Sequence, residues 1–357
     1  MEMALALAEK ARGWTSPNPH VGALIVKNEQ IVGWGFHERS GNPHAEVLAL
    51  DRAGTRAQGA TAFITLEPCT HWGRTPPCVD RLLQSRLKRV VLADLDPNPK
   101  VNRKGLGRLR QAGMLVSVGL LKEKNRRLNE VYYKYIKHKM PYITLKAAMS
   151  LDGKIATRKF VSNWISSQAT REYMHLVRGE QDAILVGINT ILKDDPLLTV
   201  RHPHWKGKRI LRIILDSQLR IPLKARVFDT LSGGDILVFT RNDPPTQKVE
   251  KLRKKGAKVI SLAGSASGID LKKCMVWLGE NEITSILVEG GGQMHTSFIE
   301  QGLGDKLLLS LSPKLIGGSA AVSWFQGRGA AAVSESLPFK KNRIFEIGGD
   351  TIIEGYL

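Results

Sequence analysis

The chain has 357 residues, of which 42% are hydrophobic and 24% are charged, a composition typical of a globular protein that is long enough to form two domains. We find no apolar run of the length needed to cross a bilayer, and the N-terminal MEMALALAEKAR indicates an amphipathic helix rather than a signal peptide. Three cysteines are too few for a disulfide framework, which favours a reducing compartment. These features predict a cytoplasmic protein without a membrane partner.

Lys and Arg outnumber Asp and Glu by 53 − 33 = 20, which raises the question of a nucleic-acid partner. The basic residues form several short clusters along the chain, and aromatic residues make up only 6% of it. Proteins that bind single strands interleave basic groups with stacking aromatic side chains. The charge therefore favours a phosphorylated small molecule, or simply a solvated basic face, over nucleic acid.

Helices and strands alternate over residues 1–119. The predicted elements are a helix over 2–12, a hairpin of strands 21–26 and 30–33, a helix that begins at His44, a strand over 63–66, a helix over 79–86, a strand over 89–93, a helix over 106–112 and a strand over 114–118. Such alternation predicts an α/β layered fold with a largely parallel sheet.

Four residues of this first part form a pattern with metal chemistry. His44 and Glu46 fall in the first turn of a predicted helix, and Cys69 and Cys78 each follow a proline. His and Cys are good Zn²⁺ ligands, and three of them leave a fourth coordination position open, as catalytic zinc sites do. Each residue taken alone is more often structural, but H-x-E followed by two P-C pairs is typical of zinc deaminases.

The polar, basic segment 120–140 is predicted to be a connecting helix and linker, with a second domain over residues 141–357. Its predicted strands cover residues 142–149, 183–186, 209–215, 235–239, 258–262 and 283–288, and its predicted helices cover residues 166–178, 188–192, 246–255 and 270–279, with one more beginning after the glycines that follow Glu289.

The last of these strands runs directly into Glu289-Gly290-Gly291-Gly292. Glycines at a strand-to-helix turn let the backbone approach a pyrophosphate, to which the helix N-terminus donates hydrogen bonds. A tight turn that needs positive φ uses glycine as well, so the pattern alone leaves both interpretations open.

Residues 1–119 resemble the cytidine-deaminase-like zinc hydrolases. Eight residues separate Cys69 from Cys78, whereas the nucleic-acid deaminases carry C-x-x-C. With PNPHVG, GNPHAE, LEPCTHWGRTPPC and DPNPKVNRKG, this part is similar to the deaminase half of the bifunctional riboflavin-biosynthesis deaminase/reductase family. The resemblance implies hydrolytic deamination of 2,5-diamino-6-(ribosylamino)pyrimidin-4-one 5′-phosphate.

The same resemblance implies roles for single residues. One Zn²⁺ per chain would be held by His44, Cys69 and Cys78, and it would lower the pKa of a water molecule. Glu46 would be the catalytic residue that takes the water proton and later protonates the ring nitrogen and the departing amine. The implied substrate contacts are Asn18, His37, His71, Arg74, Asp96 and Asn98, although Asn18, Asp96 and Asn98 also suit turns beside prolines.

The second half carries LKAAMSLDGKIAT, SNWISS, ILVGINTILKDDPLLTVR, LVEGGGQMHTSF and SPKLIGG, and it resembles the reductase half of that family, which has a dihydrofolate-reductase-like fold and uses NADPH. The reaction implied is hydride transfer that opens the ribosyl group to ribityl. The implied cofactor contacts are Met149, Trp164, Thr190, Asp194, Ser217, Gly291, Gly292, Gln293, Met294, His295, Thr296 and Ser297. The implied substrate contacts are Lys146, Ser162, Arg178, Leu198, Arg201 and Glu289.

Two positions depart from the family pattern. The family usually has glycine where this chain has Arg103, and a glycine before the reductase serine where this chain has Phe160-Val161. Both positions fall in predicted loops, and neither is a zinc ligand or Glu46. The departure at Phe160-Val161 leaves open which backbone conformation the loop near Ser162 adopts.

The second reaction has no obvious general acid, and Glu289, Asp194 and Lys146 are all candidates. From its position after a predicted strand, Arg241, next to Thr240, is a hypothesis for a contact to the 2′-phosphate of NADPH. We also expect a homo-oligomer.

Two other classes of function are kept as alternatives. A nucleic-acid deaminase with an added basic domain would explain the charge, but the interval between Cys69 and Cys78 and the reductase-like second half speak against it. A non-enzymatic, zinc-stabilised scaffold that binds pyrimidine nucleotides would explain the ligands. Glu46 speaks against that, because a structural zinc site needs no carboxylate outside its ligand set.

Overall fold

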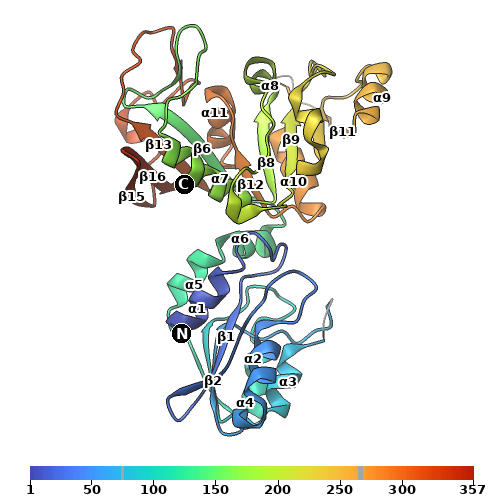
Figure 1. Ribbon diagram of the computed structural model, residues 1–357, viewed down its shortest axis with the longest axis vertical. Coiled ribbons are helices and arrows are strands. Elements are labelled where there is room, and N and C mark those ends of the chain that lie inside the picture. The colour runs from blue at the N-terminus through green and yellow to red at the C-terminus, as the bar shows by residue number, and fades with distance from the viewer. Residues whose placement is uncertain (74–75, 264–267) are drawn as a thin grey trace. The chain divides into compact units, whose positions relative to one another are not determined.

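A computed structural model describes residues 1–73, 76–263 and 268–357. The chain divides into two compact units, Met1–Met140 and Pro141–Leu357, and each is built on its own α/β sheet (Figure 1). Within the described residues, none of the helices combines the length and the apolarity needed to cross a membrane.

The first unit contains a five-stranded sheet in the order β2-β1-β3-β4-β5. Its elements are α1 (Glu2–Glu9), β1 (Gly22–Lys27), β2 (Gln30–Phe36), α2 (Ala45–Ala53), the 3₁₀ helix η1 (Gly54–Ala57), β3 (Thr61–Leu66), α3 (Cys78–Gln84), β4 (Arg89–Asp94), α4 (Lys104–Gln111), β5 (Leu115–Val118), α5 (Lys122–Leu128) and α6 (Glu130–His138).

This sheet is mixed, so the prediction of a largely parallel sheet is wrong for the first unit. Strand β1 is antiparallel to β2 and β3, whereas the pairs β3–β4 and β4–β5 are parallel. The cause lies in the hairpin turn, where Asn28 and Glu29 have φ angles of 48° and 61°. Two consecutive left-handed residues form the turn that reverses a strand onto its neighbour.

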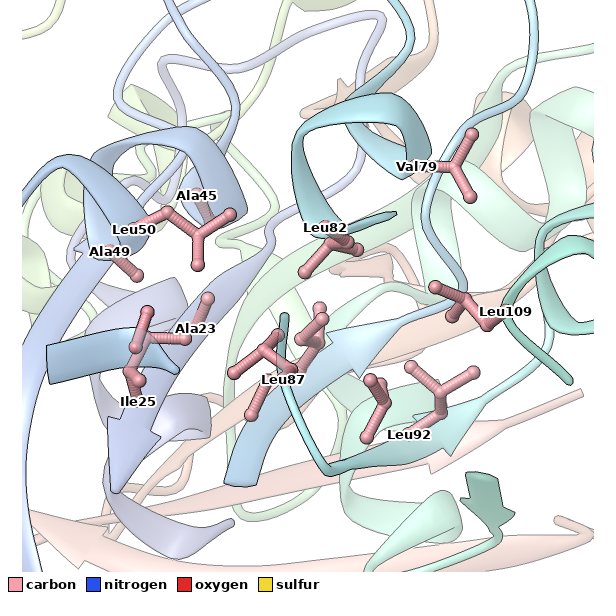
Figure 2. Packing of buried hydrophobic residues seen from close by; sticks show 14 of the residues in the cluster. Ala23, Ile25, Ala45, Ala49, Leu50, Val79, Leu82, Leu87, Leu92 and Leu109 are labelled. Atoms are coloured by element: carbon pink, nitrogen blue, oxygen red, sulfur yellow. The ribbon is translucent and has the colours of Figure 1, made fainter. Parts of the chain in front are cut away.

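Helices cover both faces of this sheet. A Cβ on Gly22 of β1 would overlap the carbonyl oxygen of Ala4 in α1, and a Cβ on Gly33 of β2 would overlap that of Ala49 in α2. Glycine is thus required where each helix approaches the strands. Figure 2 shows the core on the second face, with Ala49 of α2 above Ile25 of β1 and with Leu82 of α3 in the same buried cluster.

Residues 120–140 were expected to be one connecting helix, but they form two helices that belong to the first compact unit. Tyr132 of α6 is buried in the core of that unit. The side chain of Asn129, between the two helices, accepts a hydrogen bond from the backbone N–H of His20 (2.7 Å) and donates one to the His20 carbonyl (3.0 Å). The pair α5–α6 is therefore part of the deaminase-like fold.

The second unit contains a nine-stranded sheet in the order β11-β10-β9-β8-β12-β6-β13-β16-β15 and a small sheet of β14 and β7. Its elements are β6 (Tyr142–Ser150), β7 (Lys154–Ala156), α7 (Gln168–Gly179), β8 (Ala183–Gly187), α8 (Ile188–Asp194), η2 (Pro203–Trp205), β9 (Leu211–Leu215), η3 (Arg226–Gly233), β10 (Ile236–Thr240), α9 (Thr246–Lys254), β11 (Ala257–Ser261), α10 (Leu271–Glu280), β12 (Ser285–Val288), α11 (Gly292–Glu300), β13 (Lys306–Ser312), β14 (Val322–Ser323), η4 (Val333–Glu335), β15 (Lys341–Ile347) and β16 (Asp350–Tyr356).

All strands from β11 to β13 in this order are parallel, and β16 and β15 are added antiparallel at one edge. The helices α8 and α11 begin at the carboxyl ends of β8 and β12, which are neighbours in the sheet. Ligands of parallel α/β sheets bind in the crevice outside such carboxyl ends. The topology thus places a binding site at this edge of the second unit.

Candidate active sites

The predicted zinc ligands come together in the first unit. His44 is the residue that precedes α2, Cys69 follows β3, and Cys78 is the first residue of α3. Their ligand atoms all lie within 4.8 Å of one another, and the Nδ1 atom of His44 is 3.4 Å from the Sγ atom of Cys78 and 3.5 Å from that of Cys69. One imidazole and two thiolates at this separation are a donor set that suits Zn²⁺.

The backbone also stabilises these sulfur atoms. The backbone N–H of Cys69 donates to the Sγ atom of Cys78 (3.2 Å), and that of Cys78 donates to the Sγ atom of Cys69 (3.3 Å). Hydrogen bonds from Cys78 and His44 lower the pKa of the Cys69 thiol to about 4, against the opposing effect of burial. The hydrogen bond with Cys69 and burial raise the pKa of the Cys78 thiol, so within this pair the thiolate, which is the form that binds metal, lies on Cys69.

Glu46 lies in the first turn of α2, beside the three ligands, and is only 3% exposed. Burial raises the pKa of its carboxyl above the usual range, while the charge of His44 opposes that shift. A carboxyl group with a raised pKa exchanges a proton more readily near neutral pH than an exposed one. Glu46 thus has the position and the environment of a proton carrier.

Two predicted substrate contacts lie next to the ligands. The Nδ2 atom of Asn18 is 3.0 Å from Nε2 of His37, and Nδ1 of His37 is 3.3 Å from the carbonyl oxygen of Pro43. The rings of His37 and His44 meet edge to face, with centroids 5.3 Å apart. Burial lowers the pKa of His37, so a neutral imidazole donates to Pro43 and accepts from Asn18.

Asp96 and Asn98 occupy the loop after β4. Asp96 is 6% exposed, and its Oδ1 atom accepts hydrogen bonds from the backbone N–H of Asn98 (2.8 Å) and the hydroxyl of Tyr132 (2.9 Å). Burial raises the pKa of Asp96 to about 6, against the effect of these hydrogen bonds. The structure thus adds Tyr132 to this site, a residue for which the sequence offers no signal.

Glu67, one residue before Pro68, holds the same loop. Its carboxylate accepts hydrogen bonds from the backbone N–H groups of Asp96 (3.2 Å), Arg103 (3.0 Å) and Leu106 (3.0 Å). Arg103 has a φ of 63°, in the left-handed region that favours glycine. This conformation gives a physical reason for the glycine that the family usually has there.

The remaining two predicted contacts of the first unit lie between the cysteines. His71 is partly buried and follows Cys69 by two residues. Arg74 falls outside the described residues. The structure therefore brings Asn18, His37, Asp96 and Asn98 to the loops around the metal cluster and leaves the position of Arg74 open.

In the second unit, a cleft of about 850 Å³ lies at the carboxyl ends of the parallel strands. Most of the predicted cofactor contacts and three of the predicted substrate contacts line it. The former are Trp164, Thr190, Asp194, Ser217, Gly291, Gly292, Gln293, Met294 and Ser297, and the latter are Lys146, Ser162 and Glu289.

The turn before α11 has the geometry expected of a phosphate site. A Cβ on Gly291 would meet no atom within 4 Å, so this residue faces open space in the cleft. A Cβ on Gly292 would overlap the carbonyl oxygen of Ser323, so glycine is required there for packing. Gly290, Gly291 and Gly292 are not among the glycines with a positive φ, so the interpretation as a tight turn that needs positive φ is wrong.

Three predicted cofactor contacts do not line the cleft. Met149 is 6% exposed and lies next to Ala148, which does line it. His295 and Thr296 are buried in α11. The Thr296 hydroxyl donates to the carbonyl of Gln326 (2.6 Å) and accepts from its N–H (2.7 Å). Gln326 lines the cleft, so Thr296 holds in place the backbone of a residue at the cleft wall.

A second pocket of about 490 Å³ contains the other predicted substrate contacts, Arg178, Leu198 and Arg201, and shares Glu289 with the cleft. The Nη2 atom of Arg178 lies 2.8 Å from both carboxylate oxygens of Glu289. The pKa of Glu289 is lowered to about 2, because the charges of Arg178 and Lys146 outweigh the opposing effect of burial. Glu289 is therefore ionised at neutral pH.

Two further positions bear on the second site. Burial raises the pKa of Asp194, which lies at the end of α8 and lines both cavities. Phe160 has a φ of 61°, again in the region that favours glycine, and it also lines the cleft. Arg241, the residue after β10, is exposed and is not among the residues that line either cavity.

Comparison with known proteins agrees with this arrangement. Residues 141–353 match the RibD C-terminal domain model, and residues 1–94 match the cytidine and deoxycytidylate deaminase zinc-binding region. The riboflavin biosynthesis protein RibD of Aquifex aeolicus is 45% identical over 99% of this chain and 96% of its own.

Two solved structures are similar along the whole chain. RibD of Acinetobacter baumannii is 34% identical with a TM-score of 0.87, covering 99% of this chain and 97% of its own. A diaminohydroxyphosphoribosylaminopyrimidine deaminase/5-amino-6-(5-phosphoribosylamino)uracil reductase from Thermotoga maritima is 34% identical with a TM-score of 0.85, covering 100% and 97%. The predicted α/β class, with a cytidine-deaminase-like first unit and a reductase second unit, is confirmed. The chain belongs to the RibD family of bifunctional riboflavin-biosynthesis enzymes, which use Zn²⁺ for deamination and NADPH for reduction.

Proposed function

We propose that the first unit deaminates 2,5-diamino-6-(ribosylamino)pyrimidin-4-one 5′-phosphate with His44, Cys69 and Cys78 as zinc ligands and Glu46 as proton carrier. The observation that carries this proposal is the convergence of three ligand atoms within 4.8 Å beside a buried carboxyl group. When bound, Zn²⁺ supplies Lewis acidity and lowers the pKa of a water molecule. Glu46 accepts a proton from that water and passes it to the ring nitrogen. It then carries the proton of the newly added hydroxyl to the departing amine, so that a carbonyl forms as ammonia leaves.

The loops around the cluster supply the substrate contacts. Asn18 and Asn98 offer amide groups, His37 and His71 offer imidazole nitrogens, and Asp96 offers a carboxylate. A carboxylate accepts hydrogen bonds from hydroxyl or amino groups and repels phosphate, so we assign Asp96 to the ribose or the base. Arg74 keeps its proposed contact with the phosphate, for which a guanidinium is well suited.

The zinc assignment is tested by Cys78→Ser. The variant should lose bound zinc and ammonia release together, while it should still oxidise NADPH when given the deaminated pyrimidine. Cys274→Ser, at a buried cysteine of α10 far along the chain, is the matched control and should keep one zinc per chain. Full ammonia release by a zinc-free Cys78→Ser protein would contradict the assignment.

For the second unit, we propose that NADPH lies in the large cleft with its pyrophosphate at the turn before α11. The residues there fit the group, because Gly291 leaves its space open and the helix N-terminus presents free N–H groups. When bound, NADPH supplies the hydride that opens the ribosyl group to ribityl. Arg178 and Arg201 line the adjoining pocket, and Lys146 lines the cleft next to it. These three basic side chains would hold the phosphorylated pyrimidine.

Among the three candidate proton donors, the structure favours Asp194. Glu289 is ionised and paired with Arg178, and its pKa of about 2 makes it a poor acid. The pKa of Asp194 is raised by burial, and its side chain borders both the cofactor cleft and the substrate pocket. We therefore propose that Asp194 protonates the oxygen released when the ribosyl ring opens.

We further propose that the enzyme is a cytoplasmic homo-oligomer without nucleic-acid or membrane partners. Its deaminase domain covers residues 1–119 together with the segment 120–140 that packs on them, and its reductase domain covers residues 141–357. The small-molecule substrate explains the net charge, because basic surfaces attract phosphorylated ligands. Ammonia release should be observed with the pyrimidine phosphate and not with single-stranded DNA or tRNA. Release from a nucleic acid at a similar rate would contradict this proposal, and sedimentation of a monomer would contradict the oligomer.

A further inference from the structure

Two groups hold the carboxyl group of Asp96 in the loop after β4, while the backbone N–H of Asp96 donates to Glu67 (3.2 Å). The Oδ1 atom accepts a hydrogen bond from the backbone N–H of Asn98 (2.8 Å). The second group is the hydroxyl of Tyr132 in α6, which lies 2.9 Å from Oδ1 and 3.2 Å from Oδ2. Tyr132 and Asp96 are 8% and 6% exposed, so this contact is shielded from water.

The donors are shared unequally between the two carboxylate oxygens. Oδ1 receives both the Asn98 N–H and the closer approach of the Tyr132 hydroxyl, and each carboxylate oxygen has two lone pairs. Oδ2 has only the longer contact with the hydroxyl (3.2 Å), so this oxygen keeps more capacity to accept a hydrogen bond from a ligand. Without the hydroxyl, only the hydrogen bond from the Asn98 N–H would limit rotation of the carboxyl group about its last bond.

The same pair of helices holds the second substrate loop. Asn129 binds both backbone polar groups of His20 (2.7 and 3.0 Å) and donates to Asn125 (3.1 Å). Two residues before His20, Asn18 contacts His37. Helix α6 and the residue before it thereby reach both loops that surround the metal cluster.

We propose that Tyr132 is a positioning residue of the deaminase, which orients the Asp96 carboxylate toward the substrate, so that α6 supports the substrate-binding site through this one hydroxyl. The inference rests on the proposed role of Asp96 as a substrate contact. It assigns a role in the first reaction to a helix that the sequence indicated only as a connection between the two domains.

The test compares four variants of the full-length enzyme, namely Tyr132→Phe, Tyr133→Phe, Asp96→Ala and the double variant Asp96→Ala/Tyr132→Phe. Tyr133→Phe is the matched control, because it removes the same atom from the next residue, whose hydroxyl donates to Asp94 (2.9 Å). For each protein, the KM and kcat of ammonia release are measured together with bound zinc and NADPH oxidation on the deaminated pyrimidine.

Tyr132→Phe should raise the deaminase KM about five- to tenfold, as loss of a hydrogen bond to a charged group does, with little change in kcat, zinc or NADPH oxidation. Tyr133→Phe should leave the KM unchanged. In the Asp96→Ala background, Tyr132→Phe should have no further effect, because the two residues act as one unit.

Other outcomes separate the inference from the assignment on which it rests. A normal deaminase KM in Asp96→Ala would show that Asp96 does not contact the substrate. A raised KM for Asp96→Ala with a normal KM for Tyr132→Phe would overturn the inference alone. Additive effects in the double variant, an equal effect of Tyr133→Phe, or loss of zinc with Tyr132→Phe would also overturn it, since each shows a general structural role.

Discussion

The two units of this enzyme bind their ligands by different means. In the first unit, three side chains form the candidate metal site and one carboxyl side chain beside them is placed to transfer protons. The second unit uses the carboxyl ends of parallel strands, a glycine turn and a helix N-terminus, where the backbone makes the cleft. A site made of side chains is specified by residue identity, whereas a site made of backbone is specified by topology.

The difference extends to the charged groups. Burial raises the pKa values of Glu46 and Asp96 in the first site and of Asp194 in the second. The second site contains an ion pair in which Arg178 keeps Glu289 ionised. Buried carboxyl groups suit proton transfer, whereas a fixed ion pair suits the binding of a charged substrate.

The largest effect is expected from Glu46→Gln. Removal of the proton carrier should lower kcat for ammonia release by about 10³-fold, in the range of general acid–base catalysis. Bound zinc and NADPH oxidation on the deaminated pyrimidine should remain normal. Glu29→Gln, in the exposed hairpin turn, is the control and should have no effect, and a fully active Glu46→Gln enzyme would refute the mechanism.

Asp194→Asn tests the proton donor of the second unit. We expect kcat for NADPH oxidation to fall by about 10²-fold, with the KM for NADPH less affected and deamination unchanged. Asp195→Asn removes the neighbouring carboxylate, whose Oδ1 atom accepts the backbone N–H of Arg226 (2.9 Å), and should leave kcat unchanged. Equal losses in both variants would show that charge or folding at the end of α8, and not proton donation, is affected.

Glu289→Gln breaks the buried pair with Arg178. Loss of one partner should destabilise the second unit by about 3 kcal/mol and raise the KM for the pyrimidine. Asp235→Asn, in an exposed pair with Arg209 (3.0 Å), should cost less than about 1 kcal/mol.

The pair also predicts a pH dependence. Because folding lowers the pKa of Glu289 from 4.5 to about 2, its stabilisation is complete above pH 4.5 and is lost as the pH falls through about 2. Melting temperatures between pH 5 and 2 should therefore fall more steeply for the wild type than for Glu289→Gln. Parallel curves would show that the pair does not stabilise the unit.

Substitution of two adjacent glycines distinguishes a ligand contact from a packing contact. Gly291→Ala should raise the KM for NADPH by about tenfold without lowering the melting temperature, because a bulky group at a cofactor contact costs about 1–2 kcal/mol. Gly292→Ala should lower the melting temperature as well, because its Cβ would overlap the Ser323 carbonyl. A normal KM for NADPH in Gly291→Ala would show that the pyrophosphate does not bind at this turn.

The smallest effect is expected from Arg241→Ala. If Arg241 meets the 2′-phosphate, the preference for NADPH over NADH should fall severalfold, since one exposed charged contact is worth about 1 kcal/mol. Arg253→Ala, on α9, is the control. An unchanged preference in Arg241→Ala would eliminate this residue.

The same contrast explains what could be predicted from the sequence. The zinc ligands and Glu46 were identified because their chemistry depends on residue type and order. Tyr132 was missed because its contact with Asp96 joins residues 36 positions apart. Gln326 was missed because it is held at the cleft by its hydrogen bonds with Thr296, which belongs to another element. Strand β15 was missed because it begins with the polar run Lys341-Asn342-Arg343 and is mostly exposed.

Backbone conformation was the other unpredicted feature. The departures at Arg103 and Phe160 were noted from the sequence, but only the structure shows that both residues have left-handed φ angles, 63° and 61°. Non-glycine residues adopt this conformation at a modest energetic cost. Arg103→Gly and Phe160→Gly would remove that cost, although glycine also loses more entropy on folding.

The central claim is that one chain contains two separate active sites that act in sequence, and it is tested most directly by supplying the diaminopyrimidine phosphate with and without NADPH. Ammonia release and NADPH absorbance are followed separately for the wild type and Glu46→Gln. The wild type should release ammonia without NADPH, and Glu46→Gln should oxidise NADPH only when given the deaminated product. Rapid NADPH oxidation by Glu46→Gln on the diaminopyrimidine, or ammonia release that requires NADPH, would contradict it.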